Sequence, residues 1–182
     1  MEQERESGGS ADGPALWVLL CYRVPREPSA PRIAIWRTLK RLGTAQLGDG
    51  LVGLPADART REQLEWVAGD VAEAGGSAGV WLARPATAAQ ERQLAAAMAA
   101  ARAAEYAAVA ARARAARGAD DAERAAVLRR LRGELRRISR RDFFPPPERE
   151  QARAAVEALA SPGRPDAAGA GAVHAAGAGG RP

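Results

Sequence analysis

The sequence is poor in several residue types on which common functional sites depend. Cys21 is the only cysteine, which excludes an internal disulfide and a cysteine-rich metal site. His174 is the only histidine, which excludes histidine-pair metal sites and leaves any Ser-His-Asp triad dependent on that one residue. No pair of carboxylates has an identifiable catalytic partner either. We therefore expect a protein that is not an enzyme, with no catalytic residues, no metal site and no cofactor.

Long apolar runs are missing as well. The longest compact run, residues 15–22, has the length of a strand and falls well short of the roughly 20 residues of a membrane-spanning helix. The beginning of the chain is acidic and lacks the pattern of a signal peptide. From these two observations we expect a cytoplasmic protein without a membrane partner.

Basic residues outnumber acidic ones, and nearly all of them are arginine. The 182-residue chain has 27 Lys and Arg against 22 Asp and Glu, a formal net charge of +5, and Lys40 is its only lysine. Alanine is abundant and asparagine is absent. Because alanine and arginine both have GC-rich codons, the net charge by itself says little about a nucleic-acid partner.

The two ends of the chain differ in composition from the middle. Residues 1–14 are polar and acidic, and residues 161–182 are mostly glycine and alanine. Neither segment can bury enough apolar surface to fold alone, so we expect a disordered arm at 1–14 and a disordered tail at 161–182. The structured part then divides into residues 15–85 and residues 86–160.

Residues 15–85 alternate strand and helix signals. Strand signals cover residues 16–24, 44–47, 51–54 and 77–84, with Asp49-Gly50 as a hairpin turn between the second and third. One helix follows Pro31, and a second follows Thr60, which we expect to cap it together with Gln63. The order β-α-β-β-α-β predicts an α+β fold, a ferredoxin-like domain with a four-stranded antiparallel sheet and two helices on one face.

Residues 86–160 are expected to form a helical extension. Residues 86–117 contain neither proline nor glycine, Gly118 interrupts the helix, and Asp120 or Asp121 can cap the next one. Glu105 falls on an otherwise apolar stripe, so it needs an arginine or tyrosine partner if it is buried. Three prolines at 145–147 end the second helix, and residues 148–160 predict a short third helix.

The charges are most uneven at residues 123–141, where eight arginines face only two glutamates. At about 100° per residue, four arginines form a stripe opposite the apolar residues: Arg129, Arg132, Arg136 and Arg140. Like charges at this spacing repel one another, which favours a face that contacts phosphates of DNA or RNA. The alternative is a solvated face with some arginines bridging to the acidic last helix.

A smaller basic patch lies on the helix that follows Pro31. Arg37, Lys40 and Arg41 share one face at i, i+3 and i+4, opposite Ile35 and Leu39. A nucleic-acid contact and a solvated outer face both fit this pattern. Among uncharged candidates, Cys21 lies in an apolar strand and is expected to be core. We also expect core positions for the four tryptophans, Trp17, Trp36, Trp66 and Trp81.

Three segments resemble ChrB-type chromate resistance proteins. They are Arg32 to Gly43 (RIAIWRTLKRLG), Gln46 to Pro55 (QLGDGLVGLP) and Leu131 to Phe144 (LRGELRRISRRDFF), in one colinear order over roughly 15–160. The first segments also resemble, more weakly, the ferredoxin-like domain of PaaX-type repressors. The resemblance implies a chromate-responsive regulator of a chromate efflux gene, with DNA as partner and chromate as a candidate effector. We also expect a homo-oligomer. Family members typically carry a further C-terminal domain, where this chain has its glycine- and alanine-rich tail.

The leading hypothesis is therefore a regulator of chromate resistance that binds DNA. The arginine stripe would contact backbone phosphates, with the patch of Arg37, Lys40 and Arg41 as a second contact. Two alternatives stay open: an interaction or dimerisation module that does not bind DNA, and a small oxyanion-handling protein that uses Cys21.

Overall fold

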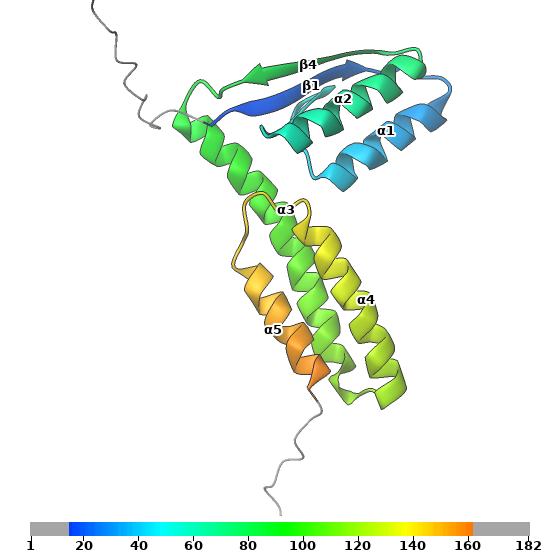
Figure 1. Cartoon of the computed structure of the whole chain (residues 1–182), viewed down its shortest axis with the longest axis vertical. Coiled ribbons are helices and arrows are strands. Elements are labelled where there is room, and N and C mark those ends of the chain that lie inside the picture. Colours follow the sequence, from blue (N-terminus) through cyan, green and yellow to red (C-terminus); the bar gives the residue numbers. More distant parts are fainter. Residues whose placement is uncertain (1–14, 162–182) are drawn as a thin grey trace, which may run out of the picture.

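The computed structural model describes residues 15–161, so the arm predicted at 1–14 and the tail predicted at 161–182, apart from Ser161, lie outside the described residues. The protein combines helices with one four-stranded antiparallel sheet, as the sequence predicted (Figure 1). Its two parts lie end to end in Figure 1, with the sheet and two helices above a bundle of three helices.

The first part follows the chain order β-α-β-β-α-β. Its elements are β1 (Trp17–Arg23), α1 (Ser29–Leu42), β2 (Ala45–Gly48), β3 (Leu51–Pro55), α2 (Ala58–Glu73) and β4 (Ser77–Ala83). The strands lie in the order β2-β3-β1-β4, and all neighbouring pairs are antiparallel. The register places Leu20 of β1 between Val52 of β3 and Val80 of β4. The tight β2-β3 hairpin turns at Asp49-Gly50, and Gly50 has the positive φ that favours glycine there.

Helices α1 and α2 cover one face of this sheet (Figure 1). Their apolar stripes contribute Ile35, Leu39, Leu64, Val67 and Val71 to the first core, where they pack with buried residues of β1 and β3. Helix α1 ends at Gly43, whose φ of 76° is the left-handed C-cap conformation that glycine adopts at least cost. The predicted cap of α2 was wrong by three residues. Asp57 caps it, because its side chain accepts from the Thr60 N–H while the Thr60 hydroxyl accepts from the Asp57 N–H.

The other face of the sheet is only partly covered, which corrects two predictions. Cys21 is exposed rather than core. Of the four tryptophans only Trp17 is buried, stacked on Phe144 at a centroid distance of 6.1 Å, while Trp36, Trp66 and Trp81 are exposed. The physical reason is that β1 is apolar on both faces, and an apolar run does not reveal which face a helix will cover. Trp36 and Trp66 belong to the outer sides of α1 and α2.

The second part is a bundle of three helices with its own core. Helix α3 (Ala88–Ala115) continues into a 3-10 turn (Ala116–Gly118), and α4 (Asp121–Ser139) and α5 (Glu148–Ala160) pack along it (Figure 1). The largest buried side chains of this core are Tyr106, Leu131, Ile138 and Leu159. Asp120 caps α4, its side chain accepting from the Glu123 N–H at 2.8 Å.

Residues 88–118 are long and apolar enough to cross a membrane by length and composition alone. The expectation that no apolar segment is long enough to span a membrane was therefore wrong, because alanine is apolar and makes up much of this helix. The same helix contributes Tyr106, Val109, Ala110 and Ala113 to the bundle core, and a core helix can pass the same test.

Candidate nucleic-acid interface

The arginine stripe lies on the outer face of α4. Leu131 and Ile138 of this helix are buried in the bundle core, and the side facing away from them is exposed. This outer side carries six exposed arginines: Arg129, Arg130, Arg132, Arg136, Arg137 and Arg140. The four predicted contact residues of α4 are thus on one accessible face of one rigid helix.

No ion pair neutralises these six arginines within the part of the chain that the structure describes. The glutamate in the middle of α4, Glu134, instead pairs with Arg112 of α3 at 2.6 Å. Two of the carboxylates near α5 pair with arginines of that helix, because Arg149 lies 3.7 Å from Asp142, and Arg153 pairs with Glu150 at 3.2 Å. Bridges from the arginine stripe to α5, the alternative considered from the sequence, are therefore not made within the described residues.

The second predicted patch lies on α1 and is partly engaged with its own helix. Arg37, Lys40 and Arg41 are all exposed. The Lys40 ammonium lies 4.8 Å from the centroid of the Trp36 ring, a cation–π contact, and Arg41 donates to the Thr38 hydroxyl at 2.8 Å. These contacts orient the two side chains outward on the last turn of α1. Arg37 has no such contact within residues 15–161 and stays available to a ligand.

The fold brings the end of α1 against the end of α4. A side chain at Gly43 would place its Cβ only 3.0 Å from the Arg141 Cβ and 3.2 Å from the Arg141 carbonyl oxygen. The first turn of α2 reaches the same point, since the Arg59 guanidinium donates to the carbonyl of Arg140 at 3.4 Å. The last turn of α1, with Lys40 and Arg41, therefore adjoins the end of the stripe at Arg140. Sequence spacing alone could not show this juxtaposition.

A cluster of charged side chains on α3 and just after the end of α4 stabilises the junction between α1 and α4. Glu105 pairs with Arg102 at 3.1 Å and with Arg141 at 2.8 Å, which supplies the arginine partner that the sequence analysis required for it. Burial lowers the pKa of Arg102, and the neighbouring Glu105 opposes this shift. The network ties α3 to the segment that follows α4, so half-buried ion pairs help to set the direction of α4.

One residue further along, Tyr106 donates to Asp142 at 2.9 Å, and the Asp142 side chain is fully buried. Burial, followed by this hydrogen bond, raises the pKa of Tyr106 to about 12. Folding therefore favours the neutral, protonated form of the Tyr106 hydroxyl. This contact anchors the start of the 142–147 connection beneath α3 and supports the geometry of the interface.

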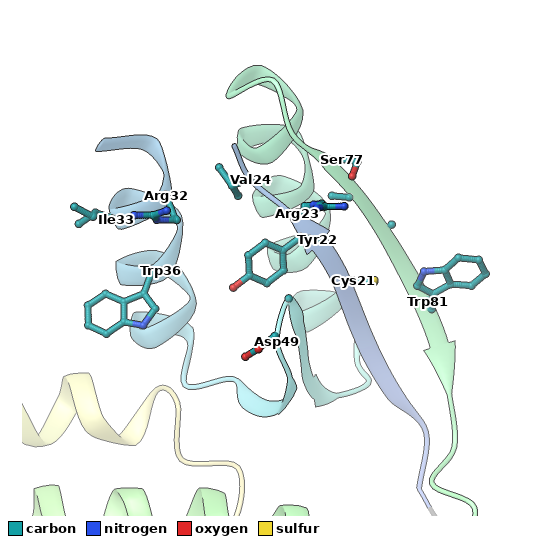
Figure 2. A pocket seen from close by; sticks show the side chains of 13 residues that line it. Cys21, Tyr22, Arg23, Val24, Arg32, Ile33, Trp36, Asp49, Ser77 and Trp81 are labelled. Atoms are coloured by element: carbon teal, nitrogen blue, oxygen red, sulfur yellow. The ribbon is translucent and has the colours of Figure 1, made fainter. Parts of the chain in front are cut away.

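A surface groove of about 1070 Å³ was missed by the sequence analysis. Figure 2 shows Trp36 and Ile33 projecting from α1 on one side, Trp81 from β4 on the other, and Tyr22 between them. The Trp81 ring lies over Gly79, where an added Cβ would be 3.0 Å from the indole nitrogen. Cys21 also lines this groove. Helical spacing sets Trp36 beside the apolar stripe of Ile35 and Leu39 and could have indicated its exposure, whereas the apolar strand that holds Trp81 does not show which of its faces is covered.

The described residues hold no group of three or more His, Cys, Asp or Glu side chains placed to bind a metal ion. The groove and the arginine face are two features of the described surface that invite a functional interpretation. The groove is lined mainly by apolar side chains, whereas the face of α4 is cationic, so the two surfaces suit different ligands.

Comparisons with known proteins agree with the resemblance seen in the sequence. Residues 32–118 match the family described as Protein ChrB, N-terminal. No curated protein and no solved structure matches the chain. The match includes α1 with its basic patch and ends with the 3-10 turn, so α4 lies beyond the matched residues. This match over residues 32–118 supports the resemblance of the chain to the amino-terminal part of ChrB-type chromate resistance proteins.

Proposed function

We propose that this protein is a ChrB-like, cytoplasmic, non-enzymatic regulator of chromate resistance that binds DNA through the outer face of α4. The observation that carries the proposal is the set of six exposed arginines on that face, none of them neutralised by an ion pair within residues 15–161. We also infer a ferredoxin-like fold for the sheet domain, supported by the element order and by the strand order β2-β3-β1-β4.

The arrangement suits contacts with a phosphate backbone. Arg129, Arg132, Arg136 and Arg140 follow one side of a rigid helix, and guanidinium groups bind phosphate oxygens through paired N–H donors. Arg37, Lys40 and Arg41 extend the cationic surface from the adjoining end of α1. Contacts of this kind supply affinity and orientation, whereas sequence specificity requires contacts to base edges.

The regulatory part of the proposal follows from the family. A chromate-responsive regulator must change its DNA affinity when the oxyanion is present, which requires that the two ligands be coupled. Chromate is a divalent oxyanion, and arginine is the side chain best suited to hold it. The coupling is tested by adding the ion.

The test is a mobility-shift titration with a DNA duplex from the promoter region of the gene that encodes this protein. We expect wild type to shift this duplex at low salt, and the variant with Arg129, Arg132, Arg136 and Arg140 replaced by Gln to lose most of the shift. A matched variant removes four exposed arginines elsewhere, Arg26, Arg92, Arg114 and Arg117, and should stay close to wild type. Equal losses in both variants would show that total charge, rather than the face of α4, is responsible.

The same titration with added chromate tests the regulatory part. We expect chromate to change the midpoint of the shift, and an equal concentration of sulfate to change it less. Binding that is indifferent to chromate would reject regulation by this ion while leaving DNA binding intact.

An interaction module that does not bind DNA is the second candidate, favoured by the groove with its exposed Trp36 and Trp81. Large exposed apolar surface marks sites of protein contact. This candidate predicts that the duplex is not retained even at low salt. It also predicts that replacing Trp36 and Trp81 by Ala abolishes a protein–protein contact.

A further inference from the structure

The outer face of α2 has features that the proposed function does not use. Trp66 is the most exposed large apolar side chain among the described residues, at 71%. It lies in a shallow groove of about 480 Å³ whose other lining residues are acidic or glycine: Glu62, Glu65, Gly69, Asp70 and Glu73. Of these carboxylates, only Glu65 has an ion pair within residues 15–161, with Arg61. A tryptophan surrounded by carboxylates is the chemistry that attracts cationic side chains.

The spacing along α2 defines a single outward stripe. Glu62, Trp66, Gly69 and Glu73 recur at i, i+4, i+7 and i+11, opposite the buried Leu64, Val67 and Val71. Gly69 has open space above it, since an added Cβ there would meet no atom within 4 Å. This stripe therefore presents a carboxylate at each end, with a large aromatic side chain and an open position between them.

Helix α4 carries a stripe with the same spacing and the complementary chemistry. Arg129, Gly133, Arg136 and Arg140 also recur at i, i+4, i+7 and i+11 on its exposed side. Gly133 is flanked by the ends of two arginine side chains, because an added Cβ would lie 3.5 Å from the Arg137 Nη1 and 3.9 Å from the Arg136 Nη2, which is ordinary contact distance. A large ring placed at Gly133 would thus contact cations on its face or edge.

We propose that the acidic stripe of α2 docks on the arginine stripe of α4 in a second copy of this chain. In a parallel alignment of the two helices, Glu62 meets Arg129 and Glu73 meets Arg140. Trp66 then lies over Gly133, between the flanking guanidinium groups, and Arg136 fills the open position at Gly69. The register places the two end carboxylates, Glu62 and Glu73, opposite arginines. The two large side chains between them, Trp66 and Arg136, each lie opposite a glycine, which suits close packing of two helices.

A second copy is the occupant that the observations favour. The unpaired arginine face and the unpaired acidic face belong to the same molecule, and both are exposed. The contact joins two different surfaces, so it is heterologous. A pair of copies joined by one such contact still has one free acidic stripe and one free arginine stripe, unless the copies close into a ring. The inference goes beyond DNA binding and is tested without nucleic acid, so the two can fail separately.

The test is sedimentation velocity of the full chain over a range of concentrations at low and at high salt. We expect association at low salt that weakens as salt is added, because the end contacts are exposed ion pairs. Variant A, Glu62→Arg with Glu73→Arg, and variant B, Arg129→Glu with Arg140→Glu, should each be monomeric alone. An equimolar mixture of A and B should associate again, because each acidic stripe then meets a basic one in the other variant.

Two further variants separate association from folding. Trp66→Ala should weaken association at least about tenfold, as truncation of a central aromatic contact does. Gly133→Gln should weaken it as well while raising the melting temperature, since glycine in a helix interior destabilises the fold. Glu157→Arg, an exposed carboxylate of α5 without an ion pair within residues 15–161, is the control for charge reversal and should associate as wild type does.

A chain that stays monomeric at low salt at all concentrations would overturn the proposal. So would an A and B mixture that stays monomeric, or association that Trp66→Ala and Gly133→Gln leave unchanged. Association that survives in A and B alone would assign the contact to another surface, with the groove at Trp36 and Trp81 as the next one to test.

Discussion

The buried contact between Tyr106 and Asp142 provides a sharp test of how the interface is held in place. The Asp142 side chain has no exposed surface, its Oδ1 has no hydrogen-bond partner within residues 15–161, and its Oδ2 accepts from the Tyr106 hydroxyl at 2.9 Å. Arg149 is 3.7 Å from Oδ2, beyond hydrogen-bond distance. In Tyr106→Phe the buried carboxyl group therefore keeps only this longer-range attraction.

Hydrogen bonds to charged groups contribute about 1.5–3 kcal/mol, so we expect Tyr106→Phe to lower the free energy of unfolding by that amount. The measurement is urea unfolding followed by far-ultraviolet circular dichroism. Tyr22→Phe is the matched control, because Tyr22 is half-buried and its hydroxyl has no hydrogen-bond partner within residues 15–161; we expect a change within about 0.5 kcal/mol. Equal effects of the two substitutions would refute the role assigned to the Tyr106–Asp142 contact.

Three other predictions concern stability and accessibility. The pKa of Tyr106 is raised from 10 to about 12, so the stabilisation by its neutral hydroxyl is complete below pH 10 and is lost as the pH rises from 10 to 12. The free energy of unfolding should fall by about 2–3 kcal/mol over this range. Alkaline unfolding followed by phenolate absorbance checks this, and Tyr106→Phe should make the fall smaller. Leu131→Ala empties a fully buried position in the bundle core and should cost about 2–5 kcal/mol in urea unfolding, a loss under 1 kcal/mol being incompatible with the packing described. Cys21 is exposed, so a thiol reagent should modify native protein completely, at a rate close to that in denaturant; protection in the native state would show that a partner covers this face.

Periodicity and turn residues predicted most of the fold correctly. Apolar residues recurring at helical spacing located α1, α2 and α4, and Asp49-Gly50 located the β2-β3 hairpin, because these signals are local. The cap of α2 was misplaced because Thr60 is a good cap residue in sequence terms. In the structure it takes the third position, and Asp57 takes the cap. Both Asp57 and Thr60 can cap a helix, and the sequence pattern alone did not show which of them does.

The surfaces were harder to predict than the elements. The stripe on α4 could be predicted because it needs only the residues of one helix, and its four arginines are exposed in the structure. The contact between Gly43 and Arg141 depends on how two distant segments pack, which no local pattern encodes. Exposure of Cys21 and Trp81 likewise depends on the sheet face that the helices leave open.

Two uses of the arginine face have been proposed, and they exclude each other at any one moment. DNA bound along α4 would occupy the arginines that the acidic stripe of a second copy also contacts. Under the proposed function, association of the chain would then compete with DNA binding, and added duplex should dissociate the assemblies. Both ligands are anionic, so salt weakens both contacts.

The salt dependence of DNA affinity tests the central claim most directly. The measurement is fluorescence anisotropy of a labelled duplex over a salt series, for wild type and for the variant with Arg129, Arg132, Arg136 and Arg140 replaced by Gln, with protein concentrations kept where each sediments as a single species. Each phosphate contact contributes about 0.9 to the slope of log affinity against log salt, so we predict that the variant's slope is shallower by about 3 to 4. Equal slopes for the two proteins would contradict the assignment of DNA binding to the face of α4.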